Sequence, residues 1–558
     1  MTRGSGVALE DRRISSKQTP RAALTKTGRF AAGLLWLVIV AALLVRIHAV
    51  TNVKEGLTHD ESIAWLCAAA GESRFAAEMP GLANRPVPAA EFQAFLQRPA
   101  SFAFRTVARD LALTDIHPPL FFWALHVHHV LFGLTPQNQS AINLGLALVT
   151  LGLVYRLGRR LSGSHWVGLV CAAVWFCSPA VMSIEFQTRH YSLFAFLVLL
   201  ALELGDRIIA GERALWVTVM FSLVCGAGML THYFFVITMV PGALMVLAID
   251  RLGGQTRRYF AAGIVAVGIF LVLYPEFFGF LRLKVAARPA AAGNAGTFAP
   301  AALMKTKAIA FGVAEYFTTW RSLYPVYAIA LLSALSVGCI RVAQHRTGCA
   351  GNGSGWLTLR NPKIRYAVVL GWFVAFTAIL YLVGVSPVHA SRGQYFSYIW
   401  PLATVFLFLL VRDIVAPRVA IGCLMFHLLQ SMASWPGIVD QSFELKPAMP
   451  TAWTEACDWS GTVITNDLRR GELLRNTLDL RPDLPVVALS DVSAVGSVRV
   501  NDVVALILDS PRNVSPQDIR KAMEEHQFRQ RGPELDAVNE RTSQWDPMTL
   551  TPWRRGGR

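Results

Sequence analysis

The sequence has few charged residues for its length. Only 16% of its 558 residues are charged, whereas 54% are hydrophobic, and ordinary soluble domains carry about 25% charged residues. This balance argues against one large soluble enzyme, and the 11% of aromatic residues excludes a disordered chain. Long apolar runs recur from Phe30 to Trp435, which predicts a polytopic α-helical membrane protein.

Several functional motifs are also missing. None of the eight cysteines forms a CxxC pair, so neither a disulfide framework nor a zinc finger is indicated. No convincing glycine-rich loop that would cradle a nucleotide phosphate is present. The excess of 52 Lys and Arg over 36 Asp and Glu would suit nucleic acid in a soluble protein. In a membrane protein it indicates positive-inside topology and anionic lipid, with no nucleic-acid partner.

The N-terminal region predicts the orientation of the chain. Residues 1–29 hold seven Lys and Arg and precede an uncharged run, Phe30 to Val45, which we interpret as a cytoplasmic segment followed by an uncleaved anchor. Segment 51–117 has six Lys and Arg against eight Asp and Glu, so we expect an extracytoplasmic loop. We expect about 11–13 transmembrane helices in a domain over 30–435. The further candidate spans are 139–157, 163–182, 190–209, 214–230, 232–249, 259–281, 324–343, 365–386, 397–411 and 419–434.

Basic loops fix the direction of these spans. The three loops expected to face the cytoplasm are 156–160, 251–258 and 341–365. This solution places Asp60, Arg189, His232 and Arg392 on one outer side. Segment 118–134 then has both ends outside, so we expect it to be re-entrant or interfacial. The alternative is that it spans and one basic loop breaks the rule.

Residues 436–558 are more polar and predict a small extracytoplasmic α/β domain. The short apolar runs GTVIT (461–465), LPVVAL (484–489) and VVALIL (503–508) are typical of strands, and 515–526 is typical of a helix. We expect the tail, 544–558, to be loose.

The strongest chemical signal is THDESIAWL, residues 58–66. Asp60 and Glu61 follow the first span, where a carboxylate can serve a reaction between a membrane-bound donor and an acceptor from either phase. The alternative is a pair of solvated loop acids, or a helix N-cap with charge in the first turn.

A second signal is TDIHPPLFFW, residues 114–123. The two prolines stop one helix and can start another, which holds Asp115 and His117 at a helix head that suits phosphate or, with both side chains, a metal. The alternative is a plain helix-entry cap. We interpret the nearby His126, His128 and His129 as interfacial or packed residues, not as ligands.

Three further segments at the ends of predicted spans complete the set of candidate site residues. SPAVMSIEFQTRHYSLF (178–194) offers Glu185, Arg189 and Tyr191, and ionisable groups at membrane depth are often functional. The guanidinium of Arg189 can bind a phosphate through two hydrogen bonds. The alternative for Arg189 is that its side chain extends to the lipid head groups. In LTHYFF (230–235), His232 is a candidate ligand or proton carrier. The alternative is a hinge between two spans in which the hydrogen bonds of His232 are satisfied within the protein.

SRGQYFSYIWPL (391–402) offers Arg392 and Tyr395, which reach a lipid-linked phosphate or belong to an ordinary aromatic belt. One early acid pair and several cations on one membrane side are what transfer of a sugar from a polyprenyl phosphate requires. In such a transfer, one acid deprotonates the hydroxyl of the acceptor, and the cations stabilise the phosphate that leaves the sugar.

These motifs, in this order, resemble the GT-C superfamily of membrane glycosyltransferases. More narrowly, the chain is similar to the bacterial branch related to protein O-mannosyltransferases and the lipid A aminoarabinose transferase. The segments that carry the resemblance are THDES (58–62), DIHPPLFFW (115–123), QTRHYSLF (187–194), LTHYFF (230–235) and RGQYFSYIWPL (392–402). The family often has Glu-Ala where Gln187-Thr188 stand, and a Glu-Arg-Tyr run where Gly393 and Gln394 separate Arg392 from Tyr395.

The resemblance implies a polyprenyl-phosphate-linked sugar donor, an outward-facing site and an inverting transfer. Asp60 matches the family's catalytic carboxylate and would act as general base, with Glu61 beside it. The donor phosphate would be bound by His117, Arg189, Tyr191, Arg392 and Tyr395. Asp115 and His232 would position the acceptor or a divalent ion; no cofactor and no obligate metal are assigned.

The acceptor implied is a lipid, a polysaccharide or a protein, and the location a bacterial inner membrane. Two other readings stay open. A transporter or flippase of a lipid-linked glycan would also need many spans and phosphate-binding arginines, but would distribute polar groups through the bundle. A non-catalytic relative acting as a partner subunit is the third reading, against which the intact Asp60 argues.

Overall fold

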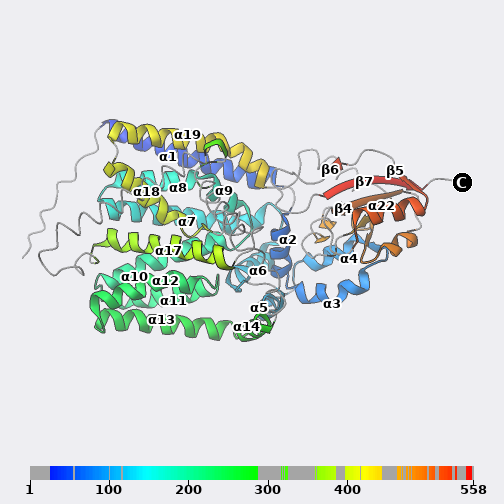
Figure 1. Ribbon diagram of the computed structural model, residues 1–558, viewed down its shortest axis with the longest axis horizontal. Coiled ribbons are helices and arrows are strands. Elements are labelled where there is room, and N and C mark those ends of the chain that lie inside the picture. Colours follow the sequence, from blue (N-terminus) through cyan, green and yellow to red (C-terminus); the bar gives the residue numbers. More distant parts are fainter. Residues whose placement is uncertain are drawn as a thin grey trace, which may run out of the picture.

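The protein consists of a helical bundle with a small sheet-containing domain at one end, shown by the computed structural model in Figure 1. The polytopic α-helical class and the small α/β domain predicted from the sequence are both confirmed. The structure describes residues 26–54, 57–99, 101–114, 117–286, 361–384, 396–414, 416–442, 461–466, 480–498, 502–508, 514–530, 535–536 and 548–555, and the isolated positions 316, 318, 321–323, 359, 468, 473–474 and 477–478.

Five described helical stretches are long and apolar enough to cross a membrane. They are Phe30–Val53, Asn138–Ser162, Gly254–Leu273, Pro362–Ile379 and Val419–Val439. They belong to α1 (Lys26–His48) and its continuation, α7 (Ala141–Ser162), α13 (Gly254–Leu273), α17 (Pro362–Gly384) and α19 (Pro417–Ser442). A sixth candidate is the pair α8 (His165–Cys177) and α9 (Pro179–Phe186), bent by 56°. The proline that opens α9 is a sufficient cause of this bend.

Other apolar helices of the described part of the chain also belong to the bundle. These are α6 (Leu120–Phe132), α10 (Tyr191–Ile209), α11 (Leu215–Met229), α12 (Phe235–Asp250) and α18 (Trp400–Ile414), with α14 (Phe277–Ala286) after α13. Helix α6 has 13 residues and is about 20 Å long, shorter than the roughly 30 Å hydrocarbon core. That length fits a segment that does not cross fully. The predicted span 324–343 lies outside the described residues, so the count of 11–13 stays a prediction.

Small residues let α7 and α8 approach closely. A Cβ on Gly168 would meet the backbone oxygen of Tyr155 at 2.6 Å, and one on Gly158 would meet the Cα of Gly168 at 3.1 Å. Such contacts between small residues replace the hydrophobic driving force that helices lack in lipid.

A buried ion pair joins the first span to the α8–α9 bend. Arg46 and Glu185 pair with side chains that are 0% and 3% exposed. Arg46 also donates to the backbone oxygen of Phe176 at 2.6 Å and lies over its ring. Because a buried charge is costly unless it is paired and hydrogen-bonded, this contact fixes α1 against the bend.

The loop 51–117 folds together with the C-terminal domain. The loop contains α2 (His59–Ala68), α3 (Glu72–Leu82), β1 (Val87–Pro88), α4 (Ala89–Gln93) and α5 (Phe104–Thr114). Strand β1 pairs antiparallel with β3 of the C-terminal domain. Buried side chains of both regions, among them Trp65, Phe92, Leu474 and Val486, form one hydrophobic core.

The sheet has the order β1-β3-β2-β4-β7-β5, with β6 on β7. Its C-terminal elements are β2 (Thr462–Thr465), β3 (Pro485–Ala488), β4 (Asp502–Leu508), α22 (Pro516–Glu525), β5 (Phe528–Gln530), β6 (Leu535–Asp536) and β7 (Met548–Arg555). Strands β3, β2 and β4 are parallel, and β7 is antiparallel to β4. The expectation of a loose tail is therefore wrong for 548–555, where Trp553 is buried.

Candidate active site

Asp60 and Glu61 lie in the first turn of α2, which a reciprocal cap holds in place. The Thr58 hydroxyl accepts from the Glu61 N–H at 3.3 Å, and the Glu61 carboxylate accepts from the Thr58 N–H at 2.9 Å. This reciprocal pair is a capping box. Glu61 therefore has the structural part that was the alternative to a catalytic one, a first-turn charge behind an N-cap. The partly exposed Asp60 is presented at the head of a fixed helix, where the helix dipole favours a carboxylate.

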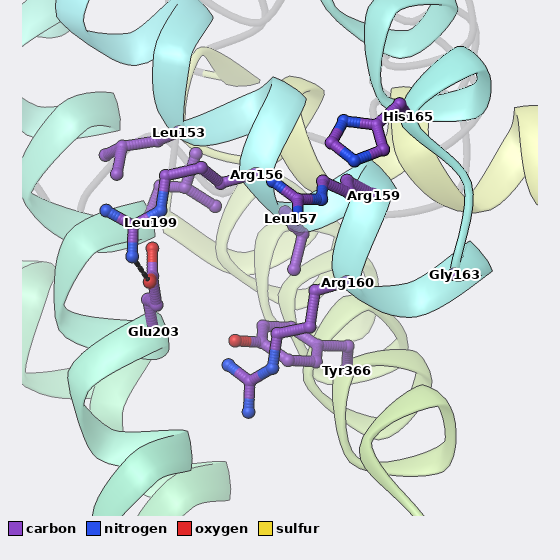
Figure 2. Close-up of a pocket in the computed structure, with 10 residues that line it drawn as sticks. All are labelled: Leu153, Arg156, Leu157, Arg159, Arg160, Gly163, His165, Leu199, Glu203 and Tyr366. Carbon is purple, nitrogen blue, oxygen red and sulfur yellow. Dashed lines mark hydrogen bonds and ion pairs between the residues drawn. The ribbon is translucent and has the colours of Figure 1, made fainter. Parts of the chain in front are cut away.

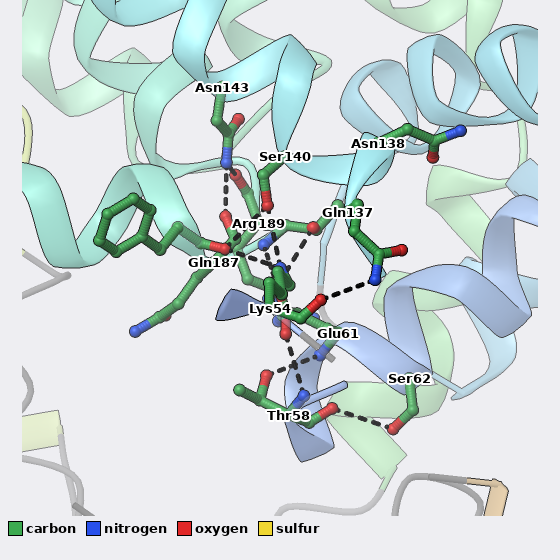
Figure 3. Close-up of polar contacts among 12 residues, drawn as sticks. Lys54, Thr58, Glu61, Ser62, Gln137, Asn138, Ser140, Asn143, Gln187 and Arg189 are labelled. Carbon is green, nitrogen blue, oxygen red and sulfur yellow. Dashed lines mark hydrogen bonds and ion pairs between the residues drawn. The ribbon is translucent and has the colours of Figure 1, made fainter. Parts of the chain in front are cut away.

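Glu61 also anchors α2 to the bundle through Lys54. Their side chains are 1% and 0% exposed and form an ion pair, and Lys54 Nζ donates further to Ser140 Oγ at 2.9 Å and to the Phe186 oxygen at 3.0 Å (Figure 3). The ammonium thus makes three hydrogen bonds to described residues, and such bonds are what a buried lysine requires.

The link between α9 and α10 docks onto the same helix head. Thr188 donates from its N–H at 3.0 Å and from its hydroxyl at 3.2 Å to the Glu61 carboxylate. Arg189 Nη1 donates to the Asp60 backbone oxygen at 3.3 Å, and Asn143 Nδ2 donates to the Arg189 oxygen at 3.1 Å (Figure 3). Arg189, only 5% exposed, is therefore held beside Asp60 although 129 residues separate them.

Three histidines gather next to this link. The ring centroids of His117 and His190 are 4.3 Å apart, and that of His232 lies 5.2 Å from His190 and 6.2 Å from His117. Phe194 stacks on His232 at 4.7 Å. His232 lies where α11 gives way to α12, and the backbone oxygen of Leu230 at the same break accepts from the N–H that opens α6 at Leu120.

Burial keeps two of these rings neutral. It lowers the pKa of His190 well below its usual value and the pKa of His232 to about 3. Desolvation disfavours the charged form, and a second positive charge among these adjacent rings would be repelled. The Phe234 N–H donates to His232 Nδ1 at 3.1 Å, so the neutral ring carries its proton on Nε2. Such a ring supplies a hydrogen-bond donor without a net charge.

The predicted residues fall into one region where the structure describes them. Asp60 and Glu61 lie on α2, and His117 lies on the segment before α6. Arg189 lies on the α9–α10 link, Tyr191 begins α10, and His232 lies at the α11–α12 break. Tyr191 is buried against His190, and its backbone oxygen accepts from Ser397 at 3.4 Å. Residues immediately after 391–395 thus lie against α10. Asp115, Arg392 and Tyr395 themselves lie outside the described residues.

The structure adds residues that the sequence reasoning did not single out. Lys54 and Thr188 fix the helix head, and His190 stands at the centre of the histidine cluster. His190 had a visible signal, because it directly follows Arg189 in QTRHYSLF, whereas the Lys54 contact depends on packing. Among the described residues, no group of three or more His, Cys, Asp or Glu is placed to hold a metal ion.

The interpretation of the later histidines as packed residues is confirmed for His126. Its Nε2 accepts from the Ala103 N–H at 2.8 Å, and its Nδ1 is bonded to the Ala68 oxygen at 2.6 Å. His129 is buried against Trp65. These rings therefore tie α6 to α2 and to the segment before α5.

Comparison with known proteins supports the predicted resemblance. A sequence profile of the family described as dolichyl-phosphate-mannose-protein mannosyltransferase matches residues 116–276. No curated protein matches the chain. Apo ArnT from Cupriavidus metallidurans matches with a TM-score of 0.51 at 12% identity, covering 94% of this chain and 98% of ArnT.

Two further solved structures are similar. ArnT bound to undecaprenyl phosphate gives a TM-score of 0.47 at 13% identity, covering 93% of this chain and 98% of that one. The Archaeoglobus fulgidus oligosaccharyltransferase with Zn and sulfate gives 0.44 at 13% identity, covering 89% and 72%. The profile match over 116–276 and the fold that the chain shares with apo ArnT agree with the resemblance that the motifs predicted.

Proposed function

We propose that the protein is a glycosyltransferase that moves a sugar from a polyprenyl-phosphate donor to an acceptor hydroxyl or phosphate group. One observation carries the proposal: Asp60 and the cation Arg189, from distant segments, are fixed side by side next to a cluster of three histidines. The description of the family that matches 116–276 supports a lipid-phosphate sugar as the donor.

The reaction needs a base on one side of the anomeric carbon and positive charge on the other. Asp60 removes the proton of an acceptor hydroxyl, the acceptor oxygen bonds to the anomeric carbon, and the bond from that carbon to the phosphate oxygen breaks, with inversion. General base catalysis typically contributes about 10²–10⁴-fold. Arg189 stabilises the phosphate that leaves, and such a preorganised donor is worth on the order of 3–4 kcal/mol.

The remaining residues take supporting parts. Both carboxylate oxygens of Glu61 are bound within the protein, so we assign Glu61 to positioning Asp60 and not to proton transfer. His117 and Tyr191, with Arg392 and Tyr395, remain proposed phosphate contacts, and Asp115 and His232 remain proposed acceptor or divalent-ion contacts. No step is derived through a metal.

The charge distribution supports an extracytoplasmic site. Helices α7, α10 and α12 begin near the site and run away from it. Eight Arg and one acid lie at or just beyond the far ends of these helices, in the segments 156–160, 207–213 and 251–258. Basic residues concentrate on the cytoplasmic side of membrane proteins. The site end, with the loop 51–117 and the sheet domain, then faces outward, in the inner membrane of a bacterium.

Sugar transfer in reconstituted vesicles tests the proposal. The wild type and Asp60→Asn would be supplied with a panel of labelled polyprenyl-phosphate sugars, and release of polyprenyl phosphate would be followed. The control is Glu78→Gln, which removes an exposed acid on α3. We expect transfer by the wild type and the control, and a loss of about 10²–10⁴-fold in Asp60→Asn.

Two outcomes contradict the assignment. Equal transfer by the wild type and Asp60→Asn would show that Asp60 is not the base. If no variant transfers sugar but the labelled lipid changes leaflet, the protein is a transporter of a lipid-linked glycan.

A further inference from the structure

A basic cavity lies at the end of the bundle remote from the candidate site. Its volume is about 500 Å³, and its wall includes Arg156, Arg159 and Arg160 of α7 (Figure 2). Asn143, near the start of the same helix, contacts the backbone of Arg189. The 17 residues from Asn143 to Arg160 span about 26 Å at 1.5 Å per residue, so the cavity and the candidate site lie at opposite ends of α7.

The cavity keeps an excess of positive charge after its internal ion pairs are counted. Arg156 pairs with Glu203 of α10, and Arg160 pairs with Asp206, which Arg365 of α17 also contacts. Asp206 and Arg365 lie outside the wall, so the wall itself holds three guanidinium groups and one carboxylate, that of Glu203. Within the described part of the chain, Arg159 has no acidic partner and is exposed at the cavity. A guanidinium is the group that best matches the geometry of a phosphate.

Two further polar groups stand on the same wall. The His165 ring at the start of α8 is hydrogen-bonded to the Tyr155 hydroxyl at 2.7 Å, which fixes its position at the cavity. Tyr366 of α17 is buried and its hydroxyl reaches the Leu202 oxygen at 3.5 Å. The cavity is thus bounded by helices α7, α8, α10 and α17, whose contacts hold its shape.

The rest of the wall is apolar. Leu153, Leu157 and Leu199 line it, and all three are at most 7% exposed. Leu153 and Leu157 stand among the arginines on α7, and Leu199 stands on α10, so apolar side chains adjoin the positive charge. A lipid would place its phosphate against the arginines and its apolar part against the leucines. A free phosphate ion would contact only the arginines. Basic pockets between transmembrane helices are known to take anionic head groups.

We propose that this cavity binds the phosphate diester of an anionic membrane lipid, in the leaflet opposite the candidate active site. Arg159 is the principal contact because no acid in the described part of the chain compensates its charge, and Arg156 and Arg160 complete the positive surface. A lipid bound there bridges α7, α10 and α17 and so stabilises the bundle at its basic end. The inference does not depend on the proposed glycosyl transfer.

The test compares lipid nanodiscs that contain the full chain. Discs of phosphatidylcholine alone, of phosphatidylcholine with phosphatidylglycerol, and of phosphatidylcholine with added inorganic phosphate would be compared for the thermal transition and for retention of labelled phosphatidylglycerol. The variants are Arg159→Gln and Arg159→Glu. The matched control is Arg213→Gln, which removes one exposed charge at the same end but outside the cavity.

We expect phosphatidylglycerol to raise the transition temperature of the wild type and of Arg213→Gln. Arg159→Gln should weaken lipid retention, and Arg159→Glu should weaken it at least about tenfold, because a charge-assisted hydrogen bond becomes a repulsion. Equal losses in Arg213→Gln and the Arg159 variants would show a general surface-charge effect and overturn the proposal. Stabilisation by inorganic phosphate to the same extent would show an adventitious or free anion and overturn the lipid assignment.

Discussion

Replacing Lys54 by methionine should destabilise the protein strongly, because Lys54 compensates a carboxylate that has no access to water. The two paired side chains are 0% and 1% exposed. Methionine keeps most of the length and the apolar stem of lysine but removes the ammonium. Among the described residues, Glu61 then retains the neutral donors of Thr58 and Thr188.

The size of the effect follows from which charge is left behind. Removing one partner of a buried ion pair costs about 3–5 kcal/mol, because the other charge stays buried and unpaired. The double variant Lys54→Met with Glu61→Gln leaves neither charge. It should therefore cost less than the sum of the two single variants, with a coupling of about 0.5–3 kcal/mol.

The assay is the free energy of unfolding, measured by titrating SDS into mixed micelles and following circular dichroism. The control is Lys521→Met in α22, where an exposed pair with Glu525 at 3.9 Å is worth only about 0.2–0.5 kcal/mol. The reasoning is refuted if Lys54→Met costs no more than Lys521→Met. Strict additivity of the two single variants would equally refute it.

Three further variants probe the site and its frame. Arg189→Lys keeps the charge but loses the planar fork, so kcat for sugar transfer should fall about 10²–10³-fold at unchanged thermal stability; an unchanged kcat would remove Arg189 from phosphate binding. Burial holds the pKa of His232 at about 3 in the folded protein, whereas the pKa in the unfolded chain is about 6.5. Between these two pH values the unfolded state binds more protons than the folded state. The free energy of unfolding therefore decreases as the pH falls below about 6.5. His232→Phe should flatten this loss, at most about 1.4 kcal/mol per pH unit, in thermal scans from about pH 6.5 to about pH 4, and a slope equal to the wild type's would contradict a neutral buried ring. A Cβ on Gly228 would lie 2.2 Å from the Phe235 ring, so Gly228→Ala should cost about 1–3 kcal/mol in the SDS titration. Gly263→Ala, with nothing within 4 Å, should be neutral or gain up to about 1 kcal/mol, and equal effects of the two alanines would argue against a tight contact at the helix break.

The sequence predicted most of the regular structure, because long apolar runs and short buried strands have simple patterns. The run GTVIT became β2 (Thr462–Thr465), and LPVVAL became β3 (Pro485–Ala488). Strand β7 was missed because Pro552 stands in its middle, opposite Val504 of β4. A proline there argues against a strand with neighbours on both sides, and only the tertiary pairing shows that β7 lies between β4 and β5.

The site residues that were predictable are those whose role follows from neighbouring residues in the sequence. Thr58 and Glu61 have the three-residue spacing of a capping box, and Arg189 and His232 stand in short polar breaks between apolar helices. The part played by Lys54 was not predictable, because its partners Ser140 and Phe186 are more than eighty residues away and the burial of the pair follows from packing. Pairing of β1 with β3 across about four hundred residues was equally invisible, since two residues carry no periodicity.

The pair of Arg46 and Glu185 sets a condition on the order in which the protein is made. Arg46 enters the membrane with the first span, but its carboxylate is encoded 139 residues later. At about 5–20 residues per second, the arginine waits roughly 7–28 seconds for its partner during synthesis. Until then the first helix must keep its charged end near the lipid head groups or against the insertion machinery. The contact between Arg46 and Glu185 therefore forms only after α9 has been synthesised, so α1 acquires its final packing against the α8–α9 bend late.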